Sequence, residues 1–119
     1  DGIEGVQQFV LKVCKEASAS SCPPWIVCIG LGGSFDSVAE LAKKAMLRKL
    51  GSKHYNNKYA KLEQDLKKKI NALGIGPQGL GGRVTALEVF IESRSCHAAS
   101  LPIAVNLQCH SHRVGRVML

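Results

Sequence analysis

Five cysteines and four histidines are the residues of this 119-residue chain best suited to hold a metal or to move a proton. Cys96 is followed directly by His97, and Cys109 is followed by His110 and His112. Structural zinc sites usually pair ligands with two to four residues between them, and the adjacent Cys96 and His97 cannot easily both face one ion. The spacing therefore disfavours zinc, while cluster chemistry stays open. An odd number of cysteines at irregular spacing also favours a reducing compartment, the cytoplasm, over a secreted disulfide framework.

Two other cysteines fall on apolar faces. Apolar residues recur at three- and four-residue intervals before Cys14, which predicts an amphipathic helix over residues 3–18 with Cys14 on its buried side. After a break at Pro23 and Pro24, residues 25–30 form an apolar run typical of a strand, with Cys28 inside it. Both thiols are expected to be core residues and not ligands.

A glycine turn, residues 30–33, leads from this strand into a helix predicted over residues 37–50. Ser37 and Glu40 have capping-box spacing, and Gly51 marks the expected end. The free N–H groups of such a helix start could receive an anion or a cluster. A turn that only joins a strand to a helix is the commoner use of this pattern.

Most of the excess positive charge, +7 overall, lies between Lys43 and Lys69. A second helix is predicted there over residues 56–73, with an apolar face and a charged one; the apolar face comprises Tyr59, Leu62, Leu66, Ile70 and Leu73. The charged face is expected to meet solvent or a partner. No groove-reading motif or base-stacking platform accompanies it, so nucleic-acid binding is not expected.

The segment from Gly74 to Gly82, GIGPQGLGG, contains G-x-G-x-x-G. It follows a helix and precedes a strand, whereas the dinucleotide-binding fingerprint follows a strand and opens a helix. A nucleotide site is therefore disfavoured, and close backbone approach to another ligand is the expected use of these glycines. Strands are predicted over residues 84–91 and 102–108, with His97 in the loop between them and Cys109 ending the second.

These elements predict a single α/β domain over residues 1–119, with a small mixed-direction sheet packed with helices. No apolar run approaches the length of a membrane helix and no signal segment opens the chain, so a soluble protein is expected. The first residue is Asp1 and not Met, and we expect the chain to be part of a longer one.

Three blocks in the same order resemble the alpha subunit of class I fumarases and L(+)-tartrate dehydratases: residues 22–45, 74–82 and 96–113. The resemblance implies the C-terminal part of that family's iron-sulfur region. In the family a 4Fe-4S cluster is held by three cysteines, and Cys22 and Cys109 match two of them. The third would lie upstream of residue 1, with Cys14, Cys28 or Cys96 as less favoured substitutes.

The resemblance also assigns the substrate contacts. His97 corresponds to a residue that touches the bound dicarboxylate and is the candidate catalytic group, and Gln78 of the glycine-rich segment is a candidate substrate contact. The family usually reads HPAS where this chain has His97-Ala98-Ala99-Ser100, so a proline restraint next to His97 is missing.

The activity implied is the reversible hydration of a small dicarboxylate, first fumarate to malate and next the dehydration of tartrate. The open iron would act as a Lewis acid. The carbon-proton base and the main arginines of the family belong to a partner, a beta subunit or a C-terminal domain, in a higher oligomer of such pairs. A non-catalytic metal- or anion-binding module of the same fold is the alternative.

One topological expectation follows from the two cysteines. Cys22 precedes its strand and Cys109 follows its own, so the two strands must run in opposite senses, or lie in separate sheets, for both residues to reach one cluster.

Overall fold

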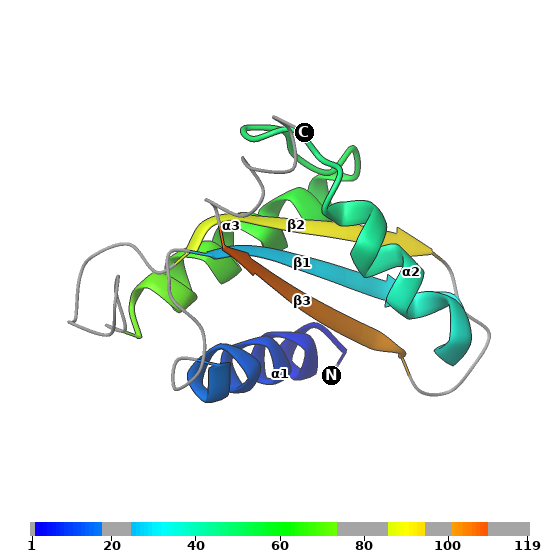
Figure 1. The fold of residues 1–119 in the computed structure, drawn as a ribbon, viewed down its shortest axis with the longest axis horizontal. Helices are drawn as coiled ribbons and strands as arrows, with labels where there is room; N and C mark the ends of the chain where they lie inside the picture. Colours follow the sequence, from blue (N-terminus) through cyan, green and yellow to red (C-terminus); the bar gives the residue numbers. More distant parts are fainter. Residues whose placement is uncertain (1, 18–24, 74–85, 95–100, 110–119) are drawn as a thin grey trace.

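The computed structural model describes residues 2–17, 25–73, 86–94 and 101–109. Within these ranges lie the helices α1 (Gly2–Ala17), α2 (Phe35–Ala45) and α3 (Asn57–Asn71) and the strands β1 (Trp25–Gly32), β2 (Ala86–Arg94) and β3 (Ile103–Cys109). The strands form one sheet in the order β2-β1-β3 (Figure 1). The α/β class and the small mixed sheet expected from the sequence are confirmed.

The two neighbours of β1 run in different directions. β2 is parallel to β1, with Trp25 opposite Ala86 and Gly32 opposite Arg94. β3 is antiparallel to β1, with Trp25 opposite Cys109. The expectation that the strand after Cys22 and the strand before Cys109 run in opposite senses is therefore confirmed.

Helices cover both faces of the sheet. On one face, side chains of α1 and α3 pack against alternate residues of β1 and β2 in the larger core cluster, which includes Val10, Val27 and Leu66. On the other face, Ala45 of α2 packs with Ile26, Cys28 and Phe90. Because β1 is central and covered on both sides, all eight of its residues are buried, which explains its continuous apolar sequence.

The glycines of the turn after β1 have structural tasks. A Cβ on Gly30 would collide with the backbone of Val38 and Ala42, so α2 can lie against β1 only because Gly30 has no side chain. Gly32 and Gly33 have φ values of +84° and +69°, which disfavour other residues. Their N–H groups donate to Pro102 O at 3.0 Å and to Arg94 O at 3.2 Å. This accounts for the turn as a connection between strand and helix.

The boundaries predicted for the helix over residues 37–50 were wrong at both ends. α2 begins at Phe35, and its capping box joins Ser34 to Ser37, not Ser37 to Glu40. The Ser37 N–H donates to Ser34 Oγ at 3.0 Å and the Ser34 N–H to Ser37 Oγ at 2.9 Å. The helix ends at Ala45, and Leu47 and Leu50 in the segment that follows are exposed. Gly51 lies in the following turn with φ +88°.

The other elements agree with the sequence to within a few residues. Asn56 caps α3, its side chain accepting from the Lys58 N–H at 2.9 Å. The predicted apolar face of α3 packs into the larger core cluster as expected, with Leu62, Leu66 and Ile70 buried. Among the described residues no helix is long and apolar enough to cross a membrane.

Candidate active-site end of the sheet

One end of the sheet gathers three of the segments singled out in the sequence. Trp25 begins β1 and is the register partner of both Ala86, which begins β2, and Cys109, which ends β3. Cys22 lies three residues before Trp25 in the sequence, and the segment with Gln78 leads into Ala86. Cys22 and Gln78 fall outside the described residues. We call this end, defined by Trp25, Ala86 and Cys109, the cysteine end of the sheet.

The topology does not bring the neighbours of His97 to the cysteine end. His97 is outside the described residues, but Arg94 ends β2 opposite Gly32, and the Gly32 N–H bonds Pro102 O just before β3. Seven residue steps of β1 separate Trp25 from Gly32, about 23 Å at the usual strand rise. The length of β3 thus keeps the residues that flank His97 apart from Cys109.

Trp25 leaves an unpaired polar atom at the cysteine end. Its side chain is only 1% exposed, and its indole Nε1 has no hydrogen-bond partner among the described residues. A buried donor without an acceptor costs free energy, and tryptophan is therefore usually paired when buried. An anionic acceptor at this end, such as a cysteine thiolate or a cluster sulfide, would be compatible with that N–H.

Cys14 and Cys28 are core residues, as the sequence indicated. Both are fully buried, Cys14 on α1 and Cys28 on β1. Burial raises the pKa of Cys14 to about 12, so its thiol stays protonated at neutral pH. Cys14 packs among the apolar side chains of the larger core cluster and is therefore a poor candidate for the third cluster ligand.

A buried charge cluster at the edge of β2 was missed by the sequence reading. Glu63 on α3 is 1% exposed and accepts from the N–H groups of His54 at 3.0 Å and Ile91 at 2.8 Å. Arg48 lies 3.4 Å from the Glu63 carboxylate and 3.2 Å from that of Glu92. In the sequence, Glu63 stands among the lysines of α3 like a residue of its charged, solvent-facing side. Nothing in the local run of lysines distinguishes it.

Removal of the Glu63 carboxylate is expected to destabilise the fold strongly, because it would leave two backbone N–H groups without an acceptor and deprive Arg48 of one of its two carboxylates. We expect Glu63→Ala to lower the free energy of unfolding by about 3–5 kcal/mol, measured by urea unfolding followed by circular dichroism. The neighbouring Gln64 is exposed, and Gln64→Ala should change it by no more than about 0.5 kcal/mol. Equally small effects of the two substitutions would mean that the buried charges contribute little to the stability of the fold.

His54 and Ser93 have the spacing of a base and a nucleophile but the wrong proton arrangement. His54 Nε2 lies 3.0 Å from Ser93 Oγ. The other ring nitrogen, Nδ1, accepts the N–H of Asn56 at 2.9 Å, so a neutral ring carries its proton on Nε2 and donates it to Ser93. A general base must instead accept the serine proton. The pair is structural.

The same histidine should make stability depend on pH. Burial lowers the pKa of His54 below its ordinary 6.5. The negative charges of Glu63 and Glu92 raise this pKa, and the positive charge of Arg48 lowers it, but burial has the largest effect. The unfolded chain therefore binds this proton at a higher pH than the folded chain, and stability falls as the pH falls through about 6.5. We expect the urea midpoint to drop more between pH 7.5 and 5.5 for the wild type than for His54→Gln. Equal drops would exclude His54 as the cause.

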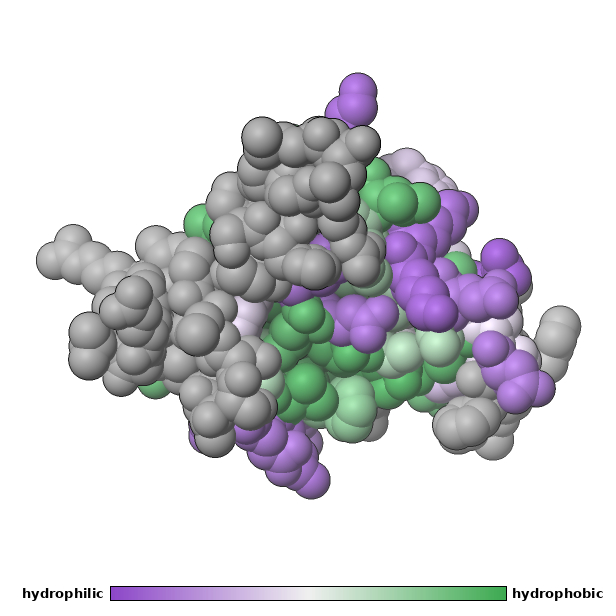
Figure 2. Space-filling view, in the orientation of Figure 1, coloured by the Kyte–Doolittle hydropathy of each residue, from purple (hydrophilic) through white to green (hydrophobic). Residues whose placement is uncertain are grey.

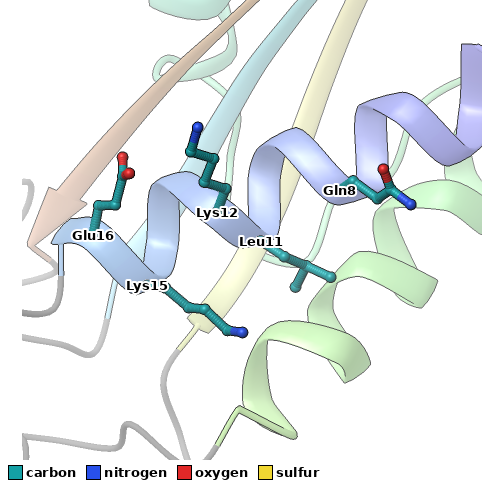
Figure 3. Close-up of a pocket in the computed structure, with 5 residues that line it drawn as sticks. All are labelled: Gln8, Leu11, Lys12, Lys15 and Glu16. Carbon is teal, nitrogen blue, oxygen red and sulfur yellow. The ribbon is translucent and has the colours of Figure 1, made fainter.

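A shallow groove of about 440 Å³ runs along α1. It is lined by Gln8, Leu11, Lys12, Lys15 and Glu16 (Figure 3). Figure 3 shows Lys12 and Glu16 extending on the side where β3 runs and Leu11 and Lys15 extending toward α3. The charged side chains of the groove, Lys12, Lys15 and Glu16, are exposed to solvent. No cluster of three metal-binding side chains occurs in the described part of the chain.

Comparison with known proteins identifies the family. The chain matches the fumarate hydratase (Fumerase) family over residues 1–118, and it belongs to that family. It is 52% identical over 113 residues to the "Putative L(+)-tartrate dehydratase subunit alpha" of Methanocaldococcus jannaschii, covering 95% of this chain and 40% of that protein. It is 40% identical to the L(+)-tartrate dehydratase subunit alpha of Escherichia coli K12, covering all of this chain and 39% of the relative. The chain thus spans about 40% of the length of these relatives.

Proposed function

We propose that this chain supplies the cluster-binding part of an iron-sulfur hydro-lyase of the fumarase family. The observation that carries the proposal is the register of the sheet, which sets Cys109 directly opposite Trp25. Three residues of chain span at most about 11 Å, so Cys22 cannot be far from the same sheet end. An all-parallel sheet would have separated the two cysteines by the length of a strand.

Cys22 and Cys109 are the proposed ligands of a 4Fe-4S cluster at the cysteine end. When bound, such a cluster supplies an iron with a free position that polarises a substrate hydroxyl and carboxylate. The unpaired indole N–H of Trp25 supports this location, because charge-assisted hydrogen bonds to cluster sulfurs help to set cluster properties. Gln78, in the segment that leads into Ala86, is the proposed contact to a substrate carboxylate.

The proposed substrate is a small dicarboxylate, and the comparisons favour tartrate over fumarate. The sequence resemblance alone ranked fumarate first. The relatives with 52% and 40% identity are both named as alpha subunits of L(+)-tartrate dehydratase. Dehydration of tartrate and hydration of fumarate both need a hydroxyl held on a metal and a base for a carbon-bound proton. The reaction class is therefore the same for either substrate.

A test of this function uses the complete alpha subunit with its beta subunit, loaded anaerobically with iron and sulfide. We expect turnover of L(+)-tartrate, and slower turnover of fumarate. A fully loaded protein that turns over neither dicarboxylate would support the alternative, a non-catalytic metal-binding module.

The partner subunit needs a docking face on this chain. The segment between α2 and α3 exposes apolar side chains beside the basic helices: Leu47 is 82% exposed, Leu50 52% and Tyr55 90%. Exposed large apolar groups at a rim of charge are common at interfaces. We propose this segment as part of the surface that meets the missing half of the enzyme.

His97 is proposed to contact the dicarboxylate, and His97→Asn should lower kcat/KM by about 10²-fold while leaving the iron content unchanged. Because the flanks of His97 lie at the far end of the sheet from Cys109, the contact could be made in a neighbouring copy of the oligomer. Mixing His97→Asn subunits with Cys109→Ser subunits distinguishes the cases: activity returns only if one copy's histidine serves another copy's cluster. An unchanged kcat/KM in His97→Asn would remove His97 from the site.

A further inference from the structure

The outer edge of β2 is closed by side chains. Asn71 on α3 accepts the N–H of Ala86 at 2.8 Å and donates to its carbonyl at 3.2 Å. Near the other end of the strand, Glu63 accepts the N–H of Ile91 and Arg48 donates to its carbonyl at 3.2 Å. Edge strands left open invite pairing with other strands, and natural proteins usually block them. Here α3 and the turn after α2 block β2.

The outer edge of β3 has no such cover among the described residues. The bond from the Gly32 N–H to Pro102 O fixes the phase of the antiparallel ladder. In an antiparallel pair, the backbone groups of successive residues point alternately toward the neighbouring strand and away from it. Ala104 and Asn106 therefore bond to β1, whereas the N–H and C=O groups of Ile103, Val105 and Leu107 point outward, away from β1. No described residue hydrogen-bonds these outward groups.

The side chains along this edge are also suited to an added strand. β3 has no charged residue and no proline, the two commonest blocks to edge pairing. Ile103, Val105 and Leu107 are only half-buried. On the face shown in Figure 2, apolar surface gathers at the centre, where Figure 1 places β3, with hydrophilic side chains around it. α1 lies alongside, with Lys12 and Glu16 on the side of the strand.

We propose that a further β-strand pairs with the open edge of β3. This strand belongs to the same alpha-subunit polypeptide and comes from the part that, in the relatives, lies outside the region matched by this chain. More than half of each relative lies outside this match, so such a strand would be on the same chain and present at high effective concentration. A second copy of this chain is less suitable, because two copies with a charge of +7 each repel one another. The inference rests on the proposed function only in placing this chain within an alpha subunit.

Amide hydrogen exchange in the complete alpha subunit tests the proposal, read residue by residue by NMR after quenching. The amides of Ala104 and Asn106 are the internal control, since they bond to β1 in any case. We expect the amides of Ile103, Val105 and Leu107 to exchange at least about 100-fold more slowly than in an unstructured peptide, as those of the control residues do. Fast exchange at the three outward positions beside slow exchange at the controls would overturn the proposal.

A pair of variants isolates the backbone contribution. Val105→Pro removes the outward N–H without breaking a bond to β1, whereas Val105→Ala shortens the side chain and keeps the N–H. In the complete subunit, Val105→Pro should abolish the slow exchange of the Ile103 and Leu107 amides, and Val105→Ala should preserve it. Slow exchange of the Ile103 and Leu107 amides in Val105→Pro would contradict the added strand. Slow exchange that depends on protein concentration, with dimers seen by sedimentation, would contradict a strand from the same polypeptide. Dehydratase activity is a separate readout, so failure of the proposed function would not be confused with failure of this inference.

Discussion

Cys109→Ser in the complete enzyme is expected to abolish cluster assembly and, with it, measurable dehydratase activity. A serine hydroxyl is a much poorer ligand for iron than a thiolate, and only three protein ligands are expected, so the loss of one leaves the cluster with two. Cys22→Ser should give the same result. Iron and sulfide analysis of freshly purified, anaerobic protein measures the effect directly.

The matched controls are Cys14→Ser and Cys28→Ser. Both side chains are fully buried in the cores beside the sheet, and the Cys14 thiol is kept protonated by its raised pKa. A hydroxyl in place of either thiol should cost about 1–3 kcal/mol of stability through burial of a polar group and leave the iron content intact. Normal iron in Cys109→Ser, or lost iron in stably folded Cys14→Ser, would show that the ligands are assigned wrongly.

The second large effect is the inactivity of this chain by itself. Within one copy the cysteine end has two proposed cluster cysteines and one candidate substrate contact, Gln78, and the described residues offer no positioned base near it. A positioned acid or base contributes typically ~10²–10⁴ in rate, and orientation of the substrate contributes further orders of magnitude. We expect the reconstituted chain alone to turn over tartrate and fumarate at least about 10⁴-fold more slowly than the complete enzyme.

Activity should return when the remaining alpha-subunit polypeptide and the beta subunit are added. The proper comparison is at equal cluster content, so that loss of the cluster is not mistaken for loss of the base. Full activity from the isolated chain would mean that the catalytic groups lie within it.

The local pattern of the sequence was sufficient for elements whose burial follows a simple period. α3 was placed to within two residues because Leu62, Leu66 and Ile70 repeat at helical spacing. β1 was recognised from its continuous apolar run, which reflects its central position in the sheet. The antiparallel direction of β1 and β3 was predicted because Cys22 and Cys109 must both reach one cluster. That requirement came from the family resemblance.

The features that were missed depend on residues far apart in the chain. Glu63 looks like a solvated charge within a lysine-rich helix, and only the fold brings Arg48 and the N–H of Ile91 against it. The early end of α2 at Ala45 was also missed, and Leu47, which follows it, is exposed.

The location of the cluster at the cysteine end is tested most directly through Trp25. It is the only tryptophan of these 119 residues, and the indole signal that disappears in Trp25→Phe identifies it in the alpha subunit. A reduced, paramagnetic cluster held by Cys22 and Cys109 should broaden or strongly shift that signal relative to the cluster-free alpha subunit. The amides of Gly32 and Gly33, about 23 Å away along β1, should be nearly unchanged. An unaltered Trp25 indole signal in a subunit that carries the cluster, with broadened Gly32 and Gly33 amides, would contradict the account.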